Sequence, residues 1–416
     1  MLKNYLKIAL KVLFRRKFFT FISLFGISFT LVVLMVVTAL LDNLLAPIAP
    51  ESRQDRMVGV YRAAMFGPRN GWTGQAGYKL LDKYARGLEG VEKLSIFSGG
   101  NNVQSFLNGQ KITSTLKRTD GEFWQILDFT FVEGTPYTVA DVENAAFVAV
   151  INETTKRRFF GEKSAIGQTL EADGQRFRVV GVVPDVSIVR LVPFSDIWVP
   201  VTTAKTDAYK HDLVGDFLAI ALAADSSALP RIHEQFNTRL AHMEFDDPKQ
   251  YQTMVAPFEN KFDALARQLP FIGDSRDPRV QGWKLVSLLA GLGLLFMLLP
   301  AVNLININVS RIMERASEIG VRKAFGASAR TLVGQFIVEN IILTLVGGAI
   351  GFVLSFFVLR ALTASGWIQY AQFQINARVF LYGLALAALF GLLSGVYPAW
   401  RMSRLNPVQA LKGASR

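Results

Sequence analysis

The 416-residue sequence contains no cysteine. This absence excludes disulfides, iron–sulfur clusters, thiolate zinc sites and cysteine nucleophiles. Charged residues are also scarce, at 19% of the chain, whereas a typical soluble domain carries about 25%. Apolar residues make up 51%, and the mean hydropathy is +0.29. The apolar excess therefore needs an environment other than the core of a water-exposed fold.

The sequence also lacks the motifs of common catalytic sites. It has no G-x-x-x-x-G-K-[ST] phosphate-binding loop and no H-E-x-x-H zinc motif. Its three histidines, His211, His233 and His242, lack ligand spacing, so we expect surface or structural roles for them. The acidic residues of segment 42–284 are scattered as on an ordinary solvated surface. We therefore predict a non-catalytic chain that binds neither a metal nor a cofactor of its own.

Four long runs contain no Asp, Glu, Lys, Arg or His: residues 18–41, 285–310, 340–359 and 379–400. A bilayer core about 30 Å thick needs about 20 helical residues, so each run predicts a transmembrane helix. The first run is longer than the apolar core of a signal peptide, about 7–15 residues, so we expect it to remain uncleaved. Ion-coupled carriers place ionisable groups at membrane depth, so the uncharged runs argue against a carrier or channel.

Basic residues beside these runs predict the orientation. Residues 1–17 contain six, the loop 311–339 contains five and the tail 401–416 contains four, whereas the loop 360–378 contains two. Lys and Arg concentrate on the cytoplasmic side of membrane proteins. Both termini are therefore predicted to be cytoplasmic, with 42–284 and 360–378 outside.

The net charge of +12 follows the same division. Segment 42–284 has 28 basic and 30 acidic residues, while the rest of the chain has 17 basic and 3 acidic residues. The positive charge is therefore a sign of topology, and we expect no nucleic-acid partner. Residues 1–17 alternate apolar and lysine faces at helical spacing, which predicts a basic amphipathic helix on the cytoplasmic membrane surface. It either only sets the topology or braces a cytoplasmic partner.

The outer segment 42–284 predicts an α+β domain. Strand, helix and strand are expected at 56–62, 77–88 and 93–97, and again at 217–222, 227–243 and 251–256. Two such β-α-β units predict a split ferredoxin-like fold built from residues of about 50–109 and 206–265. Residues of about 110–205 form a β-rich insert, with strands at 147–151 and 177–183 and a helix from an Asn152 N-cap to Phe160.

The cytoplasmic loop 311–339 has the pattern of a short capped helix. Ser317 is a candidate N-cap, Glu318 falls in the first turn, and Gly326 stands where a C-terminal glycine would. Arg322 and Lys323 lie near the end, where cations complement the helix dipole. Ser328 can cap the next helix, which continues into the third run. Such a rigid knob suits docking into another protein.

The residues of this loop carry a resemblance to a known family. The run SEIGVRKAFGASARTLVGQFIVENIILTLVGGAIG, the tail YPAWRMSRLNPVQALK (397–412) and residues 123–186 resemble the MacB/FtsX-like ABC transporter permeases. The resemblance implies an α-helical membrane protein with one plus three transmembrane helices around a large α+β extracytoplasmic domain. It also implies that the chain dimerises, with itself or with a sister permease, in the bacterial inner membrane. It places the docking surface for a cytoplasmic ABC ATPase at Glu318, Gly320, Arg322, Lys323, Gly326 and Ala327.

In this family ATP and Mg bind the ATPase, and its cycle moves the outer domains, a mechanism called mechanotransmission. MacB carries a fused ATPase, whereas this sequence starts with the amphipathic helix, so we expect the ATPase on a separate polypeptide. The resemblance implies export or handling of a peptide, antibiotic, lipid or lipoprotein, and it allows a periplasmic adaptor. The alternative is an FtsX-like regulator that activates a cell-wall hydrolase outside the membrane. The match of residues 123–186 to the MacB branch favours the first interpretation.

Small residues in the last two runs allow close helix packing. Gly347 and Gly351, like Gly391 and Gly395, have small-xxx-small spacing. These glycines pack either within one protomer, which we favour, or against a second permease.

Overall fold

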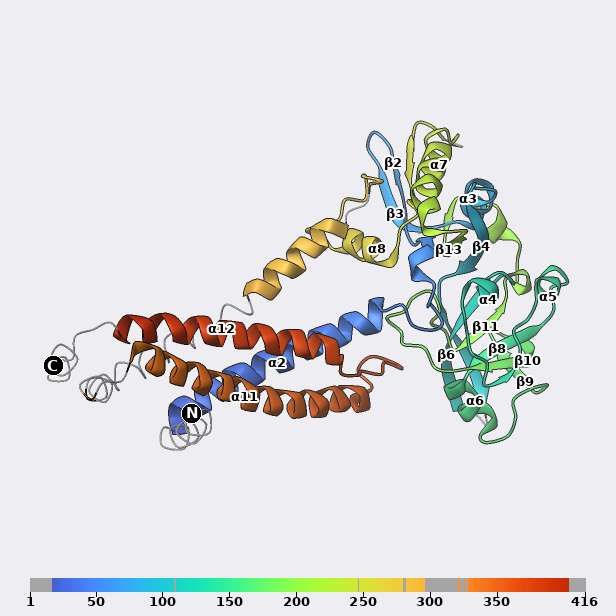
Figure 1. Ribbon diagram of the computed structural model, residues 1–416. Helices are drawn as coiled ribbons and strands as arrows, with labels where there is room; N and C mark the ends of the chain where they lie inside the picture. Colours follow the sequence, from blue (N-terminus) through green and yellow to red (C-terminus); the bar gives the residue numbers. More distant parts are fainter. Residues whose placement is uncertain are drawn as a thin grey trace. The chain divides into compact units, whose positions relative to one another are not determined.

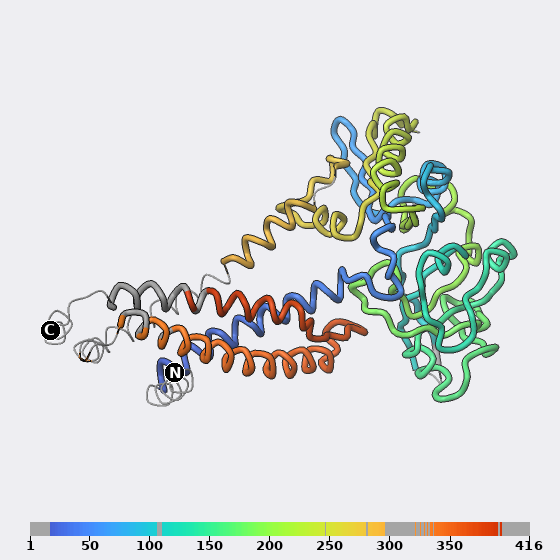
Figure 2. Tube along the Cα trace, viewed as in Figure 1, coloured from blue at the N-terminus to red at the C-terminus, as the bar shows by residue number. Residues whose placement is uncertain are grey.

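The computed structural model describes residues 17–107, 110–245, 247–279, 282–295, 321, 325 and 328–403. It divides into two compact units, shown in Figures 1 and 2. The helical unit comprises Met1–Asp42, Leu288–Trp367 and Gln372–Arg416. The outer unit comprises Asn43–Ser287 and Ile368–Ala371. The predicted amphipathic helix 1–17 lies outside the described residues except for Lys17.

The described part of the helical unit is made of helices, among them the long ones drawn in Figures 1 and 2. They are α2 (Lys17–Leu45), α11 (Ala329–Ser365) and α12 (Ala377–Ser403). Two stretches, Lys17–Leu45 and Val333–Ser365, are long and apolar enough to cross a membrane, and they contain the first and third predicted spans. Shorter apolar helices, Gly282–Leu295 and Ala377–Leu389, coincide with the starts of the second and fourth runs. Residues 296–310 lie outside the described residues, so the number of four spans stays a prediction.

The glycine pair of α11 packs against α2 within the chain. The Ser28 hydroxyl donates to the Gly347 carbonyl at 2.9 Å. A Cβ added to Gly347 would lie 2.9 Å from Ile27 Cγ2, and one added to Gly351 would lie 3.2 Å from the Ser28 backbone. Small residues therefore bring these helices into close contact. The small buried core beside them consists of Ile27, Leu31, Met35 and Phe380.

Helix α11 begins where the sequence predicts a cap. The Ser328 side chain accepts a hydrogen bond from the Thr331 amide at 3.2 Å, which satisfies one free amide of the first turn. The helix extends well before residue 340, so Glu339 is buried inside it. The predicted span 340–359 is therefore the middle of a longer helix.

The first sheet of the outer unit has seven strands, in the order β1-β13-β3-β2-β14, with β4 beside β13 and β12 beside β3. Strand β13 runs antiparallel to both β1 and β4, and all of its residues are buried. Helices α3 and α7 contribute Leu80, Leu81, Ile232 and Phe236 to the same core. The elements are β1 (Met57–Val60), β2 (Ala63–Phe66), β3 (Gly71–Ala76), α3 (Tyr78–Ala85), β4 (Val91–Ser98), β12 (Val214–Gly215), β13 (Phe217–Ala223), α7 (Leu229–Ala241), β14 (Thr253–Val255) and α8 (Lys261–Gln268).

This sheet follows the ferredoxin-like prediction only in part. The expected strands β1, β13 and β4 lie side by side, and α3 and α7 form close to their predicted positions. However, the hairpin β2–β3 stands between β1 and α3, and the last strand, β14, pairs with β2 instead of β1. The hairpin strands are short and rich in small and polar residues, so their apolar pattern is weak.

The second sheet contains the predicted β-rich insert. Its order is β5-β6-β11-β8-β10-β7, with β9 beside β10. The sheet starts before residue 110, the predicted boundary, because β5 pairs with β6 along its whole length. The elements are β5 (Asn101–Leu107), β6 (Gln110–Thr119), α4 (Phe123–Ile126), β7 (Glu133–Gly134), α5 (Val139–Glu143), β8 (Val148–Asn152), α6 (Glu153–Phe160), β9 (Thr169–Ala172), β10 (Gln175–Val183) and β11 (Ile197–Pro200).

Helix α6 confirms its predicted limits. Asn152 Oδ1 accepts a hydrogen bond from the Thr155 amide at 2.8 Å, so Asn152 is the N-cap. Gly161 follows the helix with φ +63°, a left-handed conformation that favours glycine.

Strands of the second sheet face two apolar cores. Successive strand residues point to opposite faces, so Val148 and Val150 of β8 join the core of the first sheet, while Ala149 and Ile151 join a second core. Trp198 of β11 packs on the first side, 6.0 Å from the ring of Trp124. The first core therefore unites both sheets into one body.

Candidate functional site: buried charges at the chain crossings

The predicted ATPase-docking residues cannot be placed in the fold. Glu318, Gly320, Arg322, Lys323, Gly326 and Ala327 all lie outside the described residues. Of the loop 311–339 the structure describes Val321, Phe325 and residues 328–339, and Phe325 is largely exposed. The docking surface therefore stays a prediction.

The described residues instead reveal buried charges where the chain passes between the two units. These crossings follow Asp42, Ser287, Trp367 and Ala371. Three groups of polar side chains in the outer unit hold the segments next to the crossings. We call these groups the first, second and third anchors.

The first anchor is Arg190, which holds the segment after α2. Its Nε donates to the Asn43 carbonyl at 2.9 Å, Nη2 to Ala46 at 2.8 Å, and Nη1 to Ile48 at 3.1 Å. Arg190 is only 3% exposed. The planar guanidinium presents several donors in one fixed geometry, which suits it to collect carbonyls from a bend in the chain.

Glu51 compensates the buried charge of Arg190. One oxygen of this fully buried carboxylate lies 3.3 Å from Arg190 Nη1 and also forms an ion pair with Lys261 of α8. Burial lowers the pKa of Arg190 and of Lys261, and the negative charge of Glu51 opposes the lowering in both. The first anchor thus ties the end of α2 to α8 through one carboxylate.

Lys117 of β6 supports the loop that carries Arg190. Its ammonium donates to the carbonyls of Leu191 and Val192 at 2.7 and 2.6 Å, and it lies 5.4 Å from the ring centre of Phe97. Lys117 is 1% exposed, and burial lowers its pKa to about 7. The second sheet therefore fixes the position of Arg190 through the neighbouring carbonyls.

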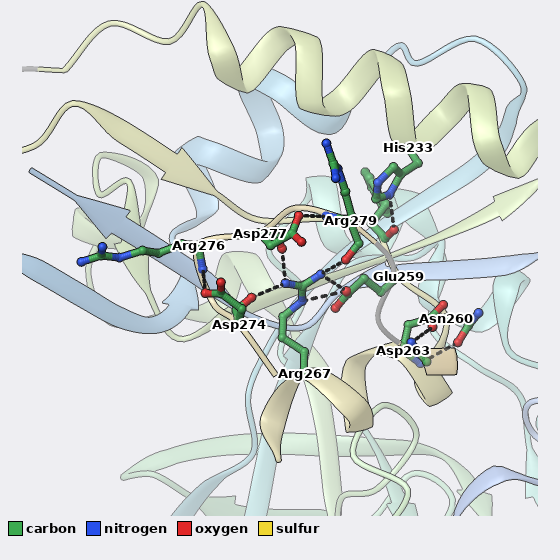
Figure 3. Close-up of polar contacts among 11 residues, drawn as sticks. His233, Glu259, Asn260, Asp263, Arg267, Asp274, Arg276, Asp277 and Arg279 are labelled. Atoms are coloured by element: carbon green, nitrogen blue, oxygen red, sulfur yellow. Dashed lines mark hydrogen bonds and ion pairs between the residues drawn. The ribbon is translucent and has the colours of Figure 1, made fainter. Parts of the chain in front are cut away.

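The second anchor is Arg267 of α8, which holds the segment that leads to the helix Gly282–Leu295. Figure 3 shows its guanidinium between Glu259 and a ring of backbone carbonyls. Nε donates to Glu259 Oε1 at 2.7 Å, and the two terminal nitrogens donate to the carbonyls of Asp274, Asp277 and Arg279. Both charged side chains are buried.

Asp263 extends the second anchor to the start of the next helix. Its Oδ1 accepts a hydrogen bond from the Gly282 amide at 2.9 Å. A Cβ on Gly282 would lie 2.2 Å from that oxygen, so only glycine allows this approach. Burial raises the pKa of Asp263, while the hydrogen bonds from Gly282 and Asn260 lower it.

The third anchor is Asp196, which holds the loop between α11 and α12. The Tyr370 hydroxyl donates to Asp196 Oδ1 at 2.8 Å, and the Ile188 amide donates to the Gln369 carbonyl at 3.1 Å. Asp196 is itself fixed by the Asn152 amide group at 3.1 Å and by a backbone amide of β6. Burial and the charge of Asp196 raise the pKa of Tyr370.

A groove of about 780 Å³ lies beside the first and second anchors. Its wall includes Leu45, Tyr61 and Phe258, together with the polar residues His233 and Lys261. His233 Nδ1 lies 2.9 Å from the Phe258 carbonyl, and His242 Nδ1 lies 2.8 Å from the Thr238 carbonyl. These contacts agree with the structural role expected for the two histidines.

All three anchors use charge-assisted hydrogen bonds, which are short and directional. Arg190 and Arg267 join a buried charge to backbone carbonyls near a crossing, whereas Asp196 accepts a hydrogen bond from the side-chain hydroxyl of Tyr370. Within the described residues, no group of three His, Asp or Glu side chains is placed to hold a metal ion.

Sequence reasoning missed all three anchors. It treated the acidic residues of this segment as solvated surface, whereas Glu51, Asp196 and Glu259 are buried. Glu51 and Arg190 are 139 positions apart, so no local spacing marks them as partners.

Comparison with known proteins identifies the class and then the family. Within the described residues, two helices are long and apolar enough to cross a membrane, and the chain also contains a large α+β unit, a combination found in membrane proteins with a folded domain outside the bilayer. Residues 20–238 match the MacB-like periplasmic core domain, and residues 290–407 match the FtsX-like permease C-terminal domain. The chain belongs to the MacB/FtsX-like ABC transporter permease family, which confirms the resemblance.

The chain is similar to several individual proteins and solved domains. The macrolide export ATP-binding/permease protein MacB of Bdellovibrio bacteriovorus is 27% identical over 327 residues, covering 78% of this chain and 48% of that protein. The chain thus spans about half the length of that relative. The uncharacterized ABC transporter permease YknZ of Bacillus subtilis is 22% identical over 335 residues, covering 79% and 77%. The crystal structure of the periplasmic region of MacB from Actinobacillus actinomycetemcomitans matches with TM-score 0.34 and 14% identity, covering 44% of this chain and 83% of that one.

Proposed function

We propose that this chain is the permease subunit of a mechanotransmission ABC transporter. ATP binding and hydrolysis on a separate cytoplasmic ATPase shift the transmembrane helices, and the outer unit moves in response. The observation that carries the proposal is the set of three anchors. Two of the anchors fix the backbone next to a crossing with a buried ion pair and hydrogen bonds to carbonyls, which supports transmission of motion along the chain.

In this proposal the chain segments held by Arg190 and Arg267 are stiff. Breaking a buried ion pair by removing one partner costs about 3–5 kcal/mol, because a charge is left uncompensated. The segments at Arg190 and Arg267 therefore resist separation from the outer unit when the helices pull on them. A displacement of α2 or of the helix Gly282–Leu295 would pass into the sheets rather than being absorbed by a loose linker.

The proposal includes the topology predicted from the sequence. Both termini lie in the cytoplasm of a bacterium, the outer unit lies outside the inner membrane, and four helices span the bilayer. Two permeases assemble with two ATPases, either as a homodimer or with a sister permease. The MacB relative is named as an ATP-binding/permease protein, and this chain matches about half of it.

The proposed work is export or extracytoplasmic handling of a peptide, antibiotic, lipid or lipoprotein, with or without a periplasmic adaptor. We place ATPase docking at the loop residues Glu318, Gly320, Arg322, Lys323, Gly326 and Ala327. ATP and Mg would be bound by the ATPase.

Purification of the tagged chain in mild detergent, with mass spectrometry of bound proteins, tests the proposal. We expect an ABC ATPase to remain bound, and we expect Glu318→Lys and Arg322→Glu to release it. Arg360→Glu is the matched control, because this charge reversal lies near the end of α11 that we place outside. A preparation without any ATPase, even after crosslinking, would contradict the proposal. A cell-wall hydrolase bound to the outer unit would favour the FtsX-like regulator instead.

A further inference from the structure

The turn after α8 displays the most exposed large apolar side chain of the described residues. Phe271 is 99% exposed. The turn is nevertheless rigid, because the amides of Ile272 and Gly273 donate to the Leu269 carbonyl at 3.0 and 2.8 Å. A Cβ on Gly273 would lie 1.8 Å from the Arg267 carbonyl, so the backbone packs directly on the end of α8. Phe271 is therefore held outward by fixed structure.

The same turn is tied to the start of the helix Gly282–Leu295. Lys284 Nζ donates to the Ile272 carbonyl at 3.3 Å, and the second anchor holds Gly282. Trp283, beside Lys284, is 66% exposed. Phe271, Trp283 and Lys284 thus belong to one local structure, which we call the aromatic rim.

The helix that follows Trp283 has an apolar surface open to its surroundings. Val286, Leu288 and Leu292 are each more than 40% exposed, as are Leu294 and Leu295. Such a helix is stable in lipid but not in water. Tryptophan and lysine flank membrane spans at the level of the headgroups, where an amphipathic ring and a cation are both favoured. The rim therefore lies where the chain enters the outer leaflet.

We propose that the aromatic rim is a lipid-binding surface, with Phe271 and Trp283 in the interfacial layer and the Lys284 ammonium among lipid phosphates. The argument rests on the proposed function in one respect, the assignment of run 285–310 as a span. Phe271 is a second, separate insertion point, and hydrogen bonds join its turn and α8 to Gly282 and Lys284 at the start of the helix Gly282–Leu295. Binding of the rim would hold α8, and with it both Glu259 and Lys261, at a constant depth beside the membrane.

The absence of cysteine makes a direct test practical. Single-cysteine variants Phe271→Cys, Trp283→Cys and Val132→Cys of the full chain are spin-labelled in nanodiscs of phosphatidylethanolamine and phosphatidylglycerol. Val132 is the matched control, because it is a 50% exposed apolar residue of the second sheet region. The readout is collision of the label with oxygen, which enters lipid, against collision with a water-soluble nickel chelate.

At position 271 we expect oxygen collisions to rise and nickel collisions to fall relative to position 132, as at position 283. A label at 271 that behaves like the label at 132, while 283 reports lipid, would overturn the rim and leave the span intact. Nickel access at 283 as well would instead refute the span, and with it the proposed topology. Dipolar broadening between two labels at 271 would show a second copy of the chain there and would also overturn the inference. Phe271 is fully exposed, so its replacement leaves the fold intact.

Discussion

Arg190 makes three hydrogen bonds to carbonyls and one ion pair while almost completely shielded from water. A buried guanidinium is tolerated only when its charge and its donors are all compensated. Glu51 supplies the charge, and the bend after α2 supplies the carbonyls. The residue is thus a fixed point between the second sheet and the end of a membrane helix.

We expect Arg190→Met to lower the free energy of unfolding of the outer unit by about 3–5 kcal/mol, because Glu51 loses a buried partner. Arg157→Ala is the control. Arg157 forms an ion pair with Asp185 in the same region, but its side chain is 57% exposed, so a change within about 0.5 kcal/mol is expected. Denaturant unfolding followed by tryptophan fluorescence measures both. Equal effects of the two variants would show that the buried ion pair of the first anchor contributes no more to stability than the exposed pair of Arg157.

Lys117 predicts a specific dependence of stability on pH. Burial lowers its pKa in the folded protein to about 7, from 10.5 in the unfolded chain. Between these values the unfolded chain binds a proton that the folded protein does not, so the free energy of unfolding rises with pH across this window. Below about pH 7 Lys117 is protonated in both states, so its titration no longer changes the free energy of unfolding, which then carries the full cost of the buried charge.

Lys117→Met removes the titrating group and should therefore flatten the rise in unfolding free energy between about pH 7 and pH 10.5. Lys205→Met removes a lysine of the same unit whose side chain is 56% exposed, and it should keep the slope of the parent. A slope that survives in Lys117→Met would assign the pH dependence to other groups.

At the scale of elements, much of the fold could be predicted because local rules determine it. Helix α6 starts and ends where Asn152 and Gly161 indicate, and α11 starts at Ser328, since caps act within a few residues. The hairpin β2–β3 and the pairing of β14 with β2 were missed, because strand order depends on contacts between distant segments. The anchors were missed for the same reason, as Lys261, Arg190 and Glu51 meet only in the folded unit.

The contact between α2 and α11 leads to a prediction about helix packing. Gly351→Leu places a large side chain where Leu31 Cβ and the Ser28 backbone would lie 3.2 Å from an added Cβ. Overpacking of this kind costs about 1–3 kcal/mol, so the thermal midpoint of the detergent-solubilised protein should fall. Gly334→Ala in the same helix is the control, because among the described residues no atom outside its own stretch of helix lies within 4 Å of an added Cβ. We expect this change to stabilise the helix by up to about 1 kcal/mol.

At the scale of the whole molecule, the chain passes between the two units at four crossings. The anchors lie next to these crossings. The third anchor differs from the others because it holds the loop between two helices, α11 and α12. Each of the other two anchors holds a segment at the end of one helix. If the anchors transmit motion as proposed, weakening the third anchor should uncouple the outer unit from the helices without unfolding either unit.

Tyr370→Phe provides this separation. It removes the hydroxyl that donates to Asp196 but keeps the ring beside Phe194, 6.3 Å between centres. Asp196 keeps its bonds to Asn152 and Thr115, so the loss is one charge-assisted hydrogen bond, about 1.5–3 kcal/mol. We expect faster amide exchange at residues 368–371 and an unchanged melting of the sheets, because the released segment is local.

In the complex with its ATPase, Tyr370→Phe should also reduce the ATP-dependent change in distance between spin labels at Val132→Cys of two permeases, while the rate of ATP hydrolysis stays the same. Trp367→Phe changes an exposed ring in the same loop and should leave the distance change intact. A full distance change in Tyr370→Phe, despite faster exchange at 368–371, would mean that motion reaches the outer unit through Arg190 and Arg267 alone. A loss of hydrolysis together with the distance change would instead place Tyr370 in the ATPase cycle itself, upstream of the outer unit.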